Sequence, residues 1–227
     1  NSAVLLVIMM SCVRWYKKHP LEDGAPKGGV GMIEATVLSI YNDVIKGCIG
    51  ENYRRYAPYL LTAFFFVLVN NLMGLIPIFP GGANVTGNIA ITLVLALCTF
   101  VLTNVYGTKA YWKEIFWPDV PTWLKAPIPM MPLIEFFGIF TKPFALMIRL
   151  FANIMAGHAA VLSLVAIIFI TVKSGPVING SMTVVSVAFS IFMDALEILV
   201  AFIQAYVFTM LSAVFIGLSQ VKEHAEK

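Results

Sequence analysis

The longest apolar segment of the chain, residues 133–172, constrains the fold more than any other feature. From Ala145 to Val172 it holds one permanently charged residue, Arg149, and it is long enough to cross a bilayer hydrocarbon core of about 30 Å. Hydrophobic residues make up 59% of the chain and charged residues 12%. Lipid offers no partner for backbone polar groups, so spanning elements must be helices or closed barrels. The short alternating segments typical of a barrel are absent from the sequence. It therefore predicts an all-α polytopic membrane protein with about five spanning helices and an interfacial amphipathic helix.

The apolar runs place the helices within one membrane domain over residues 1–227. They are a first helix (1–16), an interfacial helix (30–53), two spanning helices (60–79 and 89–106), an arginine-bearing helix (133–172) and a final helix (181–218). We expect the last two to be long, tilted and paired as a hairpin. Because the chain starts at Asn1 rather than Met, we expect its first helix to be cut short, as a spanning helix or a signal sequence.

Two segments have a less regular pattern. Residues 30–53 carry apolar side chains at helical spacing with charges between them, which favours a helix lying along the membrane interface. A helix packed beneath a soluble domain is the alternative. Residues 107–132 are rich in proline and tryptophan and predict an irregular interfacial connector.

Lysine and arginine residues gather on one side of the predicted membrane. Twelve of the 15 fall on the side of the C-terminus, Lys173 falls on the other side, and Lys142 and Arg149 fall within the bilayer. Positive residues favour the cytoplasmic side. The sequence thus predicts a multi-pass membrane protein with a cytoplasmic C-terminus.

Arg149 needs a physical reason to lie within the bilayer. A guanidinium group stays charged in proteins, and placing it at a helix centre costs roughly 3 kcal/mol on insertion scales and ~10 to 17 kcal/mol in simulations of an isolated helix. A partner or a water-filled cavity is therefore expected. The alternative is an arginine that snorkels to the interface or pairs within its own bundle.

Helical geometry, at about 100° per residue, sorts the polar groups of residues 133–172 into two sets. Glu135, Lys142 and Arg149 are spaced by seven residues and fall on one stripe, which Asn153 joins one turn later. His158 follows Arg149 by nine residues and is expected on the opposite side. One helix then presents a mainly cationic stripe to one neighbour and an imidazole to another.

The final helix carries polar residues on one face. Asp194, Glu197 and Gln204 are spaced by three and seven residues, and a hairpin can bring this face to His158. An imidazole titrates near neutrality, and a buried carboxyl group can exchange protons in the same range, so the pair predicts a proton relay. The alternative is that each group is a satisfied structural polar residue.

Two adjacent amides, Asn70 and Asn71, interrupt the apolar run 60–79. They indicate either interhelical hydrogen bonding, worth about 0.6 kcal/mol on average, or contact with water.

Several functional classes are not indicated. Cys12, Cys48 and Cys98 are odd in number, far apart and without metal-binding spacing, so we expect neither disulfides nor a metal site. No basic patch with interleaved aromatic residues suggests nucleic acid. We expect no cofactor.

Taken together, these residues resemble subunit a of F-type ATP synthases, over roughly residues 30–227. Three stretches carry the resemblance: Lys142-Pro-Phe-Ala-Leu-Met-Ile-Arg149-Leu-Phe-Ala-Asn153-Ile-Met-Ala-Gly157, Gln204-Ala-Tyr-Val-Phe and Asn71-Leu-Met-Gly-Leu-Ile-Pro77. The arginine-bearing stretch is the most specific of them.

The resemblance implies a role for each polar residue. Arg149 would be the stator arginine facing the rotor ring of subunit c, with Asn153 and Gln204 lining the same contact. Glu135 matches an acidic position of the cytoplasmic channel. His158 and Glu197 match a pair in the opposite channel that occurs in either order among family members.

The family's mechanism implies further partners and an ion. Two offset aqueous half-channels would carry the ion. The ion could be H⁺ or Na⁺, because the selectivity between them lies mainly in the ring. The partners would be the ring, the peripheral stalk subunit b and the bilayer, and the chain would be a non-catalytic subunit. Phe215 stands where many members have a tyrosine, and Ala145 stands where serine is frequent. These two departures affect only the route by which the ion leaves on the cytoplasmic side.

Two other functional classes compete with this reading. A self-contained proton-coupled secondary transporter would show inverted repeats or paired broken helices, which the sequence lacks. A purely structural assembly subunit would leave the polar stripes without a role.

Overall fold

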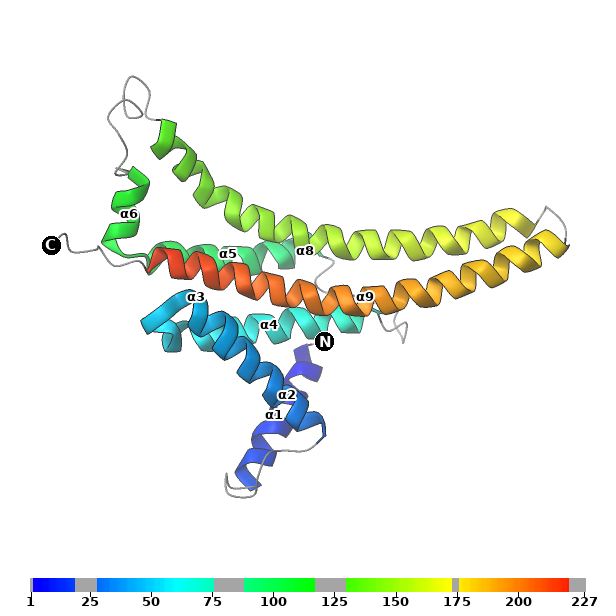
Figure 1. Ribbon diagram of the computed structural model, residues 1–227, viewed down its shortest axis with the longest axis horizontal. Coiled ribbons are helices and arrows are strands. Elements are labelled where there is room, and N and C mark those ends of the chain that lie inside the picture. Colours follow the sequence, from blue (N-terminus) through cyan, green and yellow to red (C-terminus); the bar gives the residue numbers. More distant parts are fainter. Residues whose placement is uncertain (1, 19–27, 76–87, 117–129, 173–175, 221–227) are drawn as a thin grey trace.

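The computed structural model describes residues 2–18, 28–75, 88–116, 130–172 and 176–220 (Figure 1). These residues are almost entirely helical, and no strand occurs among them. The predicted all-α class is confirmed. The helices in chain order are α1 (Ser2–Lys18), α2 (Gly29–Ser39), the π-helical η2 (Ile40–Lys46), α3 (Gly47–Ile49), the 3-10 turn η3 (Gly50–Asn52), α4 (Tyr53–Leu75), α5 (Ile89–Val105), α6 (Lys109–Phe116), α8 (Met130–Thr171) and α9 (Pro176–Ser219).

Three helices of the described part are long and apolar enough to cross a membrane. They are Tyr53–Leu75, Phe136–Thr171 within α8 and Ile178–Ser219 within α9. The fourth apolar helix, α5, has 17 residues, or ~26 Å at about 1.5 Å per residue. The described residues therefore hold fewer full-length spans than the predicted five. The first helix, α1, is as short as α5 and ends on two lysines.

Helix α5 is polar on its inner face and apolar on its outer face. Its buried residues are Thr92, Ala96, Thr99 and Thr103, while large side chains such as Val101 and Val105 are exposed. Asn88 caps its first turn, because its side chain accepts a hydrogen bond from the Ala90 amide at 3.0 Å. This inside-out pattern fits a helix whose outer surface meets lipid.

Helix α4 is the centre of the packed core. Its buried residues Leu60, Phe64 and Val67 contact Ile45 of η2 and Phe208 of α9 in one cluster. Lipid tails are as apolar as these side chains, so association of the helices depends on close packing rather than on burial alone. Small residues at the contacts therefore matter for stability.

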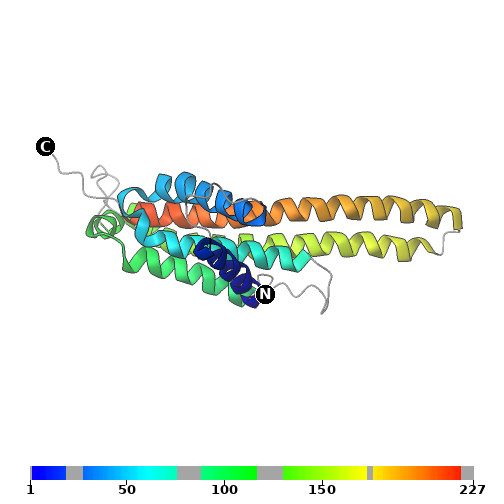
Figure 2. The same cartoon turned by 90° about the horizontal axis from the view of Figure 1, so that it is seen from below.

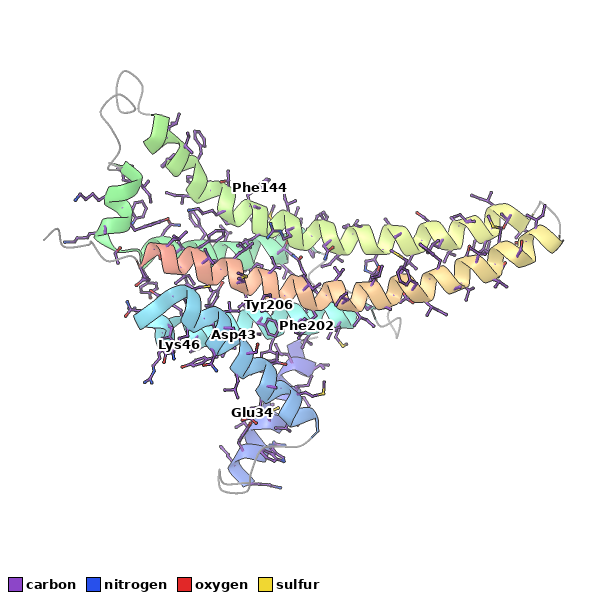
Figure 3. All side chains as sticks on the ribbon, viewed as in Figure 1. Glu34, Asp43, Lys46, Phe144, Phe202 and Tyr206 are labelled. Atoms are coloured by element: carbon purple, nitrogen blue, oxygen red, sulfur yellow. The ribbon has the colours of Figure 1, made fainter. Side chains whose placement is uncertain are left out.

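The segment predicted as one interfacial helix, residues 30–53, is divided in the structure. It comprises α2, η2, α3 and η3, and Gly50 has a positive φ of 75°, which breaks the helix before α4. Only its second half is buried, with Ile40 and Val44 in the core cluster. In Figure 1, α1 and α2 form an arm that projects from the bundle, and Figure 3 shows Glu34 on that arm.

The connector predicted to be irregular, residues 107–132, contains the helix α6. Thr108 starts it, with its hydroxyl accepting a hydrogen bond from the Tyr111 amide at 3.3 Å. Tyr111 and Ile115 are buried against Ile139 of α8, and this packing stabilises a helix that the proline-rich composition did not reveal. Residues 117–129 lie outside the described part.

Helices α8 and α9 form the long hairpin that the sequence predicts. They have 42 and 44 residues, which is ~63 and ~66 Å at about 1.5 Å per residue. Both lie side by side in Figures 1 and 2, and their ends near residues 173–175 extend beyond α4 and α5. Pro143 lies inside α8, which is curved in Figure 1, as expected where a proline removes a backbone hydrogen bond.

Candidate functional site

A polar pocket lies where α4 ends and the α8–α9 hairpin continues. The space between its lining residues, including the part open to solvent, is about 340 Å³. Its lining residues are Asn71 and Leu75 of α4, Asn153, Ile154, Gly157 and His158 of α8, and Glu197, Val200 and Ala201 of α9. Four of the residues singled out by the sequence, on three helices, thus share one space. We call it the His158–Glu197 pocket.

Glu197 is the carboxylate of this pocket. It is half-buried, and its Oε1 atom is buried without a hydrogen-bond partner. His158 and Asp194 are close enough to interact with it electrostatically. Within the described residues no direct hydrogen bond joins His158 to Glu197, so a bridging water is the simplest partner for the unpaired oxygen.

Gly157 makes room for the carboxyl group. A Cβ atom at this position would stand 2.8 Å from Cδ of Glu197 and closer still to its Oε1. Such a contact is shorter than carbon atoms tolerate, so only glycine lets Glu197 occupy this place. The sequence analysis quoted Gly157 in its motif but did not assign it a role. Its proximity to Glu197 depends on helix register, which a single sequence does not reveal.

Asn71 closes the α4 side of the pocket. It is 4% exposed, and its Nδ2 donates to the backbone oxygen of Ala201 on α9 at 3.5 Å. Asn70 instead donates to Phe66 of its own helix at 2.7 Å. Asn71 therefore makes the interhelical hydrogen bond that was one of the two alternatives, and it also lines the pocket.

Arg149 faces away from the bundle. Its side chain is exposed, and no hydrogen bond or ion pair to it occurs among the described residues. Residues one and two turns away on the same face are Ala145, Ala152 and Ala156, which are exposed as well. A partner helix can approach closely where the side chains are small. The small side chains around Arg149 leave room for another helix to approach.

The predicted stripe along α8 is not continuous. Lys142 is half-buried, and its Nζ lies 5.8 Å from the centre of the Phe215 ring on α9. Asn153 points into the pocket with His158, while Arg149 is exposed. The side chain of Glu135 lies outside what the structure describes, although its backbone is part of α8.

The three polar residues predicted to share one face of α9 differ in their exposure. Asp194 is exposed, Glu197 is half-buried and Gln204 is 6% exposed. A spacing of three residues rotates a side chain by about 60°, which is enough to move Asp194 out of the pocket. Asp194 is near Glu197 without lining the pocket.

A second pocket, which the sequence analysis missed, lies on the other side of Arg149 along α8. It holds about 260 Å³ of space. Residues 139–146 of α8 contribute to it, whereas residues 153–158 contribute to the His158–Glu197 pocket. Its lining residues are Thr99, Phe100, Thr103 and Asn104 of α5, Tyr111 of α6, Ile139, Lys142, Pro143 and Leu146 of α8, and Phe215 of α9. We call it the Asn104 pocket.

Neither pocket is built as a metal site. Among the described residues, no group of three or more histidine, cysteine, aspartate or glutamate side chains is placed to hold a metal ion. The polar groups that converge are amides, hydroxyls, one imidazole and one carboxylate, which suit water and protons.

Comparison with known proteins agrees with the resemblance. Residues 2–217 match the family described as ATP synthase A chain. The chain is 49% identical over 232 residues to an ATP synthase subunit a of Chlorobium phaeobacteroides, and the match covers 99% of this chain and 64% of that protein. The corresponding identity is 48% for an ATP synthase subunit a 2 of Chlorobaculum tepidum, over 96% of this chain and 60% of the relative.

A more distant relative gives the same result. An ATP synthase subunit a of Myxococcus xanthus is 43% identical over 96% of this chain and 70% of its own length. The chain thus spans about three fifths to two thirds of the length of the relatives it matches. With a family match over residues 2–217 and identity of this level across nearly the whole chain, the protein belongs to the ATP synthase subunit a family.

Proposed function

We propose that this chain is the stator subunit that carries protons past the rotor ring of an F-type ATP synthase. In this role Arg149 faces the ring of subunit c, and two water-filled half-channels reach it from opposite sides of the membrane. The chain itself makes and breaks no bond of ATP. It couples the movement of an ion to rotation of the ring.

The observation that carries the proposal is the position of Arg149. It is an exposed guanidinium, without a described partner, in a helix long and apolar enough to cross a membrane. Lipid alone would make that position costly by several kcal/mol. The alanines around it favour close approach of another helix, and a carboxylate on that helix would supply the missing countercharge.

Electrostatics gives the arginine its task. At ~4 Å and an effective dielectric constant near 20, a guanidinium attracts a carboxylate by about 4 kcal/mol. A ring carboxyl group that arrives protonated therefore loses its proton as it passes Arg149. The same fixed charge repels a proton that would move straight from one half-channel to the other, so ions cross only when the ring turns.

The two pockets support offset half-channels. The His158–Glu197 pocket and the Asn104 pocket adjoin α8 on either side of Arg149, towards opposite ends of the helix. In the first, His158, Glu197, Asn153 and Asn71 would pass protons from the non-cytoplasmic side. Each proton releases ~2.3 kcal/mol per 100 mV of membrane potential, which rotation would deliver to ATP synthesis.

Charge distribution supports the orientation. Twelve of the 15 lysine and arginine residues fall on the side of the C-terminus, which we assign to the cytoplasm. The membrane would be the plasma membrane of a bacterium. We assign H⁺ as the ion because an imidazole and a carboxylate share one pocket, with Na⁺ as the alternative that ring chemistry decides. The peripheral stalk subunit b would be a further partner.

Site-directed cross-linking tests which face of α8 meets the ring. Cys12, Cys48 and Cys98 are first replaced by serine, and a cysteine is introduced at Ala152, on the Arg149 face. A second cysteine is placed beside the carboxylate of the ring subunit, and the assembled complex is oxidised. We expect a disulfide-linked product between this chain and the ring subunit.

Leu146→Cys is the matched control. Leu146 lies six residues before Ala152 on the same helix but is only 2% exposed, against the core. It should give little cross-linked product. Equal yields at both positions, or a higher yield at position 146, would contradict the proposed rotor face. A purified complex that functions without any ring of small hairpin proteins would instead favour a self-contained transporter.

A further inference from the structure

The Asn104 pocket contains an unpaired acceptor. The Nδ2 group of Asn104 donates to the backbone oxygen of Phe100 at 2.8 Å, which fixes the amide plane. Its Oδ1 atom is buried and has no hydrogen-bond partner among the described residues. A buried acceptor left unpaired lowers stability. Because Asn104 lines a pocket with room for water, a water molecule is its natural partner.

The same pocket contains a cation that needs solvation. Lys142 carries three donors on its ammonium group, and its described neighbours in the pocket include no carboxylate. Its Nζ atom lies over the face of the Phe215 ring, 5.8 Å from the ring centre. At this distance the ring stabilises the charge of the ammonium group much less than water does. The charge therefore draws water into the pocket.

Hydroxyl groups of α5 extend the polar lining. Thr103 lies next to Asn104, and its Oγ1 donates to the backbone oxygen of Thr99 at 2.8 Å, which leaves its lone pairs as acceptors. Thr99 accepts from or donates to Tyr59 at 2.8 Å and Ser212 at 3.4 Å. These contacts hold the α5 hydroxyls rigidly in place. These oxygen-bearing residues of α5 line the same pocket as Lys142.

Position 215 supplies no hydroxyl to this region, since its side chain is an apolar phenyl ring packed on Lys142. Polar groups for a path between Arg149 and the α6 end of the bundle must come from another helix. Among the described lining residues, α5 provides most of them through Thr99, Thr103 and Asn104, and α6 adds Tyr111.

We propose that the Asn104 pocket is the hydrated segment of the cytoplasmic half-channel, and that Asn104 is a positioning residue that holds its water against Lys142. The inference rests on the proposed function and assigns the exit path to the groove between α5 and α8. Lys142 alone would repel a passing proton. The oxygens of Asn104 and Thr103 offset that repulsion by stabilising positive charge on the opposite wall of the pocket.

Thiol labelling tests whether the pocket is wet. In a chain with serine at positions 12, 48 and 98, Asn104→Cys should react with a membrane-impermeant anionic methanethiosulfonate applied from the cytoplasmic side. Because Lys142 is positively charged, the anionic reagent should modify the cysteine faster than a cationic reagent of the same size. Val101→Cys is the control, because Val101 is 50% exposed on the outer face of α5, one turn away. No labelling at position 104, or equal labelling at both positions, overturns the proposal.

Proton conduction tests the role of Asn104. The complete complex, with each variant in place, is reconstituted in vesicles, and ATP-driven proton pumping is measured. Asn104→Leu removes the acceptor and should slow pumping by at least about fivefold, as expected for a lost hydrogen bond to a charged or bridging group. Asn104→Gln keeps the amide oxygen and should restore most of the rate.

The outcomes separate this inference from the function on which it rests. If Asn104→Leu pumps at the normal rate while Arg149→Ala is inactive, the exit path lies elsewhere and the stator role stands. If Arg149→Ala also functions normally, the proposed function itself fails. A loss in Asn104→Leu that Asn104→Gln does not recover would show a packing role for Asn104 and would overturn the positioning role.

Discussion

The carboxyl group of Glu197 on α9 occupies the space that a side chain at position 157 of α8 would need. A Cβ atom on Gly157 would stand 2.8 Å from Cδ of Glu197. The α8 side of the proposed proton relay therefore has no room for a side chain at position 157. The absence of a side chain at one residue positions the titratable group of another.

Adding one methyl group at position 157 should disturb the relay. Gly157→Ala forces Glu197 out of its place, because the clash is with the carboxyl carbon itself. We expect ATP-driven proton pumping to fall by about tenfold or more, the size of effect that misplacement of a functional group produces. Gly138→Ala on the same helix is the control, since nothing lies within 4 Å of its Cβ position. Normal pumping in Gly157→Ala would show that the position of Glu197 is unimportant.

Exchanging His158 and Glu197 should preserve function better than changing either one. The single changes His158→Glu and Glu197→His pair like groups, which raises the cost of ionising both, while the double exchange restores one imidazole and one carboxylate. A double-mutant cycle of proton pumping should give a coupling of about 1 kcal/mol or more. Strictly additive losses would mean that the two side chains act separately.

Glu135 should lie in a water-accessible path on the cytoplasmic side. It precedes Arg149 by 14 residues, or about four helical turns, in the direction of that side. Glu135→Cys, in the chain without native cysteines, should react with a membrane-impermeant thiol reagent added from the cytoplasm. Labelling that occurs only from the opposite side would reverse the topology.

Gly217 should be needed for stability rather than for conduction. A Cβ atom there would stand 3.0 Å from the carbonyl carbon of Cys48 and 3.5 Å from Cα of Ile49, and backbone atoms cannot rotate away. Gly217→Ala should destabilise the detergent-solubilised protein by roughly 1–3 kcal/mol, the usual cost of overpacking. This destabilisation should appear as a lower midpoint of thermal unfolding. Gly180→Ala, in open space on the same helix, should leave the midpoint unchanged; an equal decrease in both variants would contradict the account.

The sequence predicted most of what lipid dictates. Long apolar runs require helices, so the all-α class and the long pair α8 and α9 follow from composition and spacing. His158 and Glu197 line one pocket, as expected from the residue spacing that assigns their helix faces and from the hairpin that pairs the two helices. These features depend on local chain geometry, which periodicity records.

Features that depend on contacts between helices were not accessible in this way. The Asn104 pocket needs four helices to form, and although the sequence analysis named Lys142 and Phe215, nothing in the sequence indicated that they share a pocket with Asn104. Lys142 and Asn153 of the predicted stripe line pockets shared with neighbouring helices, while Arg149 is exposed, and a helix wheel does not contain these neighbours. Packing on Ile139 likewise made α6 a helix despite a proline-rich context.

The central claim is that Arg149 acts on a carboxylate of the rotor ring, and proton-driven ATP synthesis by Arg149→Ala measures it most directly. The variant complex is purified, checked for the presence of this chain and of the ring, and reconstituted in vesicles with an imposed proton gradient. We expect an assembled complex with no detectable synthesis, and the same for Arg149→Lys, because an ammonium group is a strongly hydrated point charge that does not reproduce the planar guanidinium. Synthesis near the wild-type rate in either variant would contradict the account.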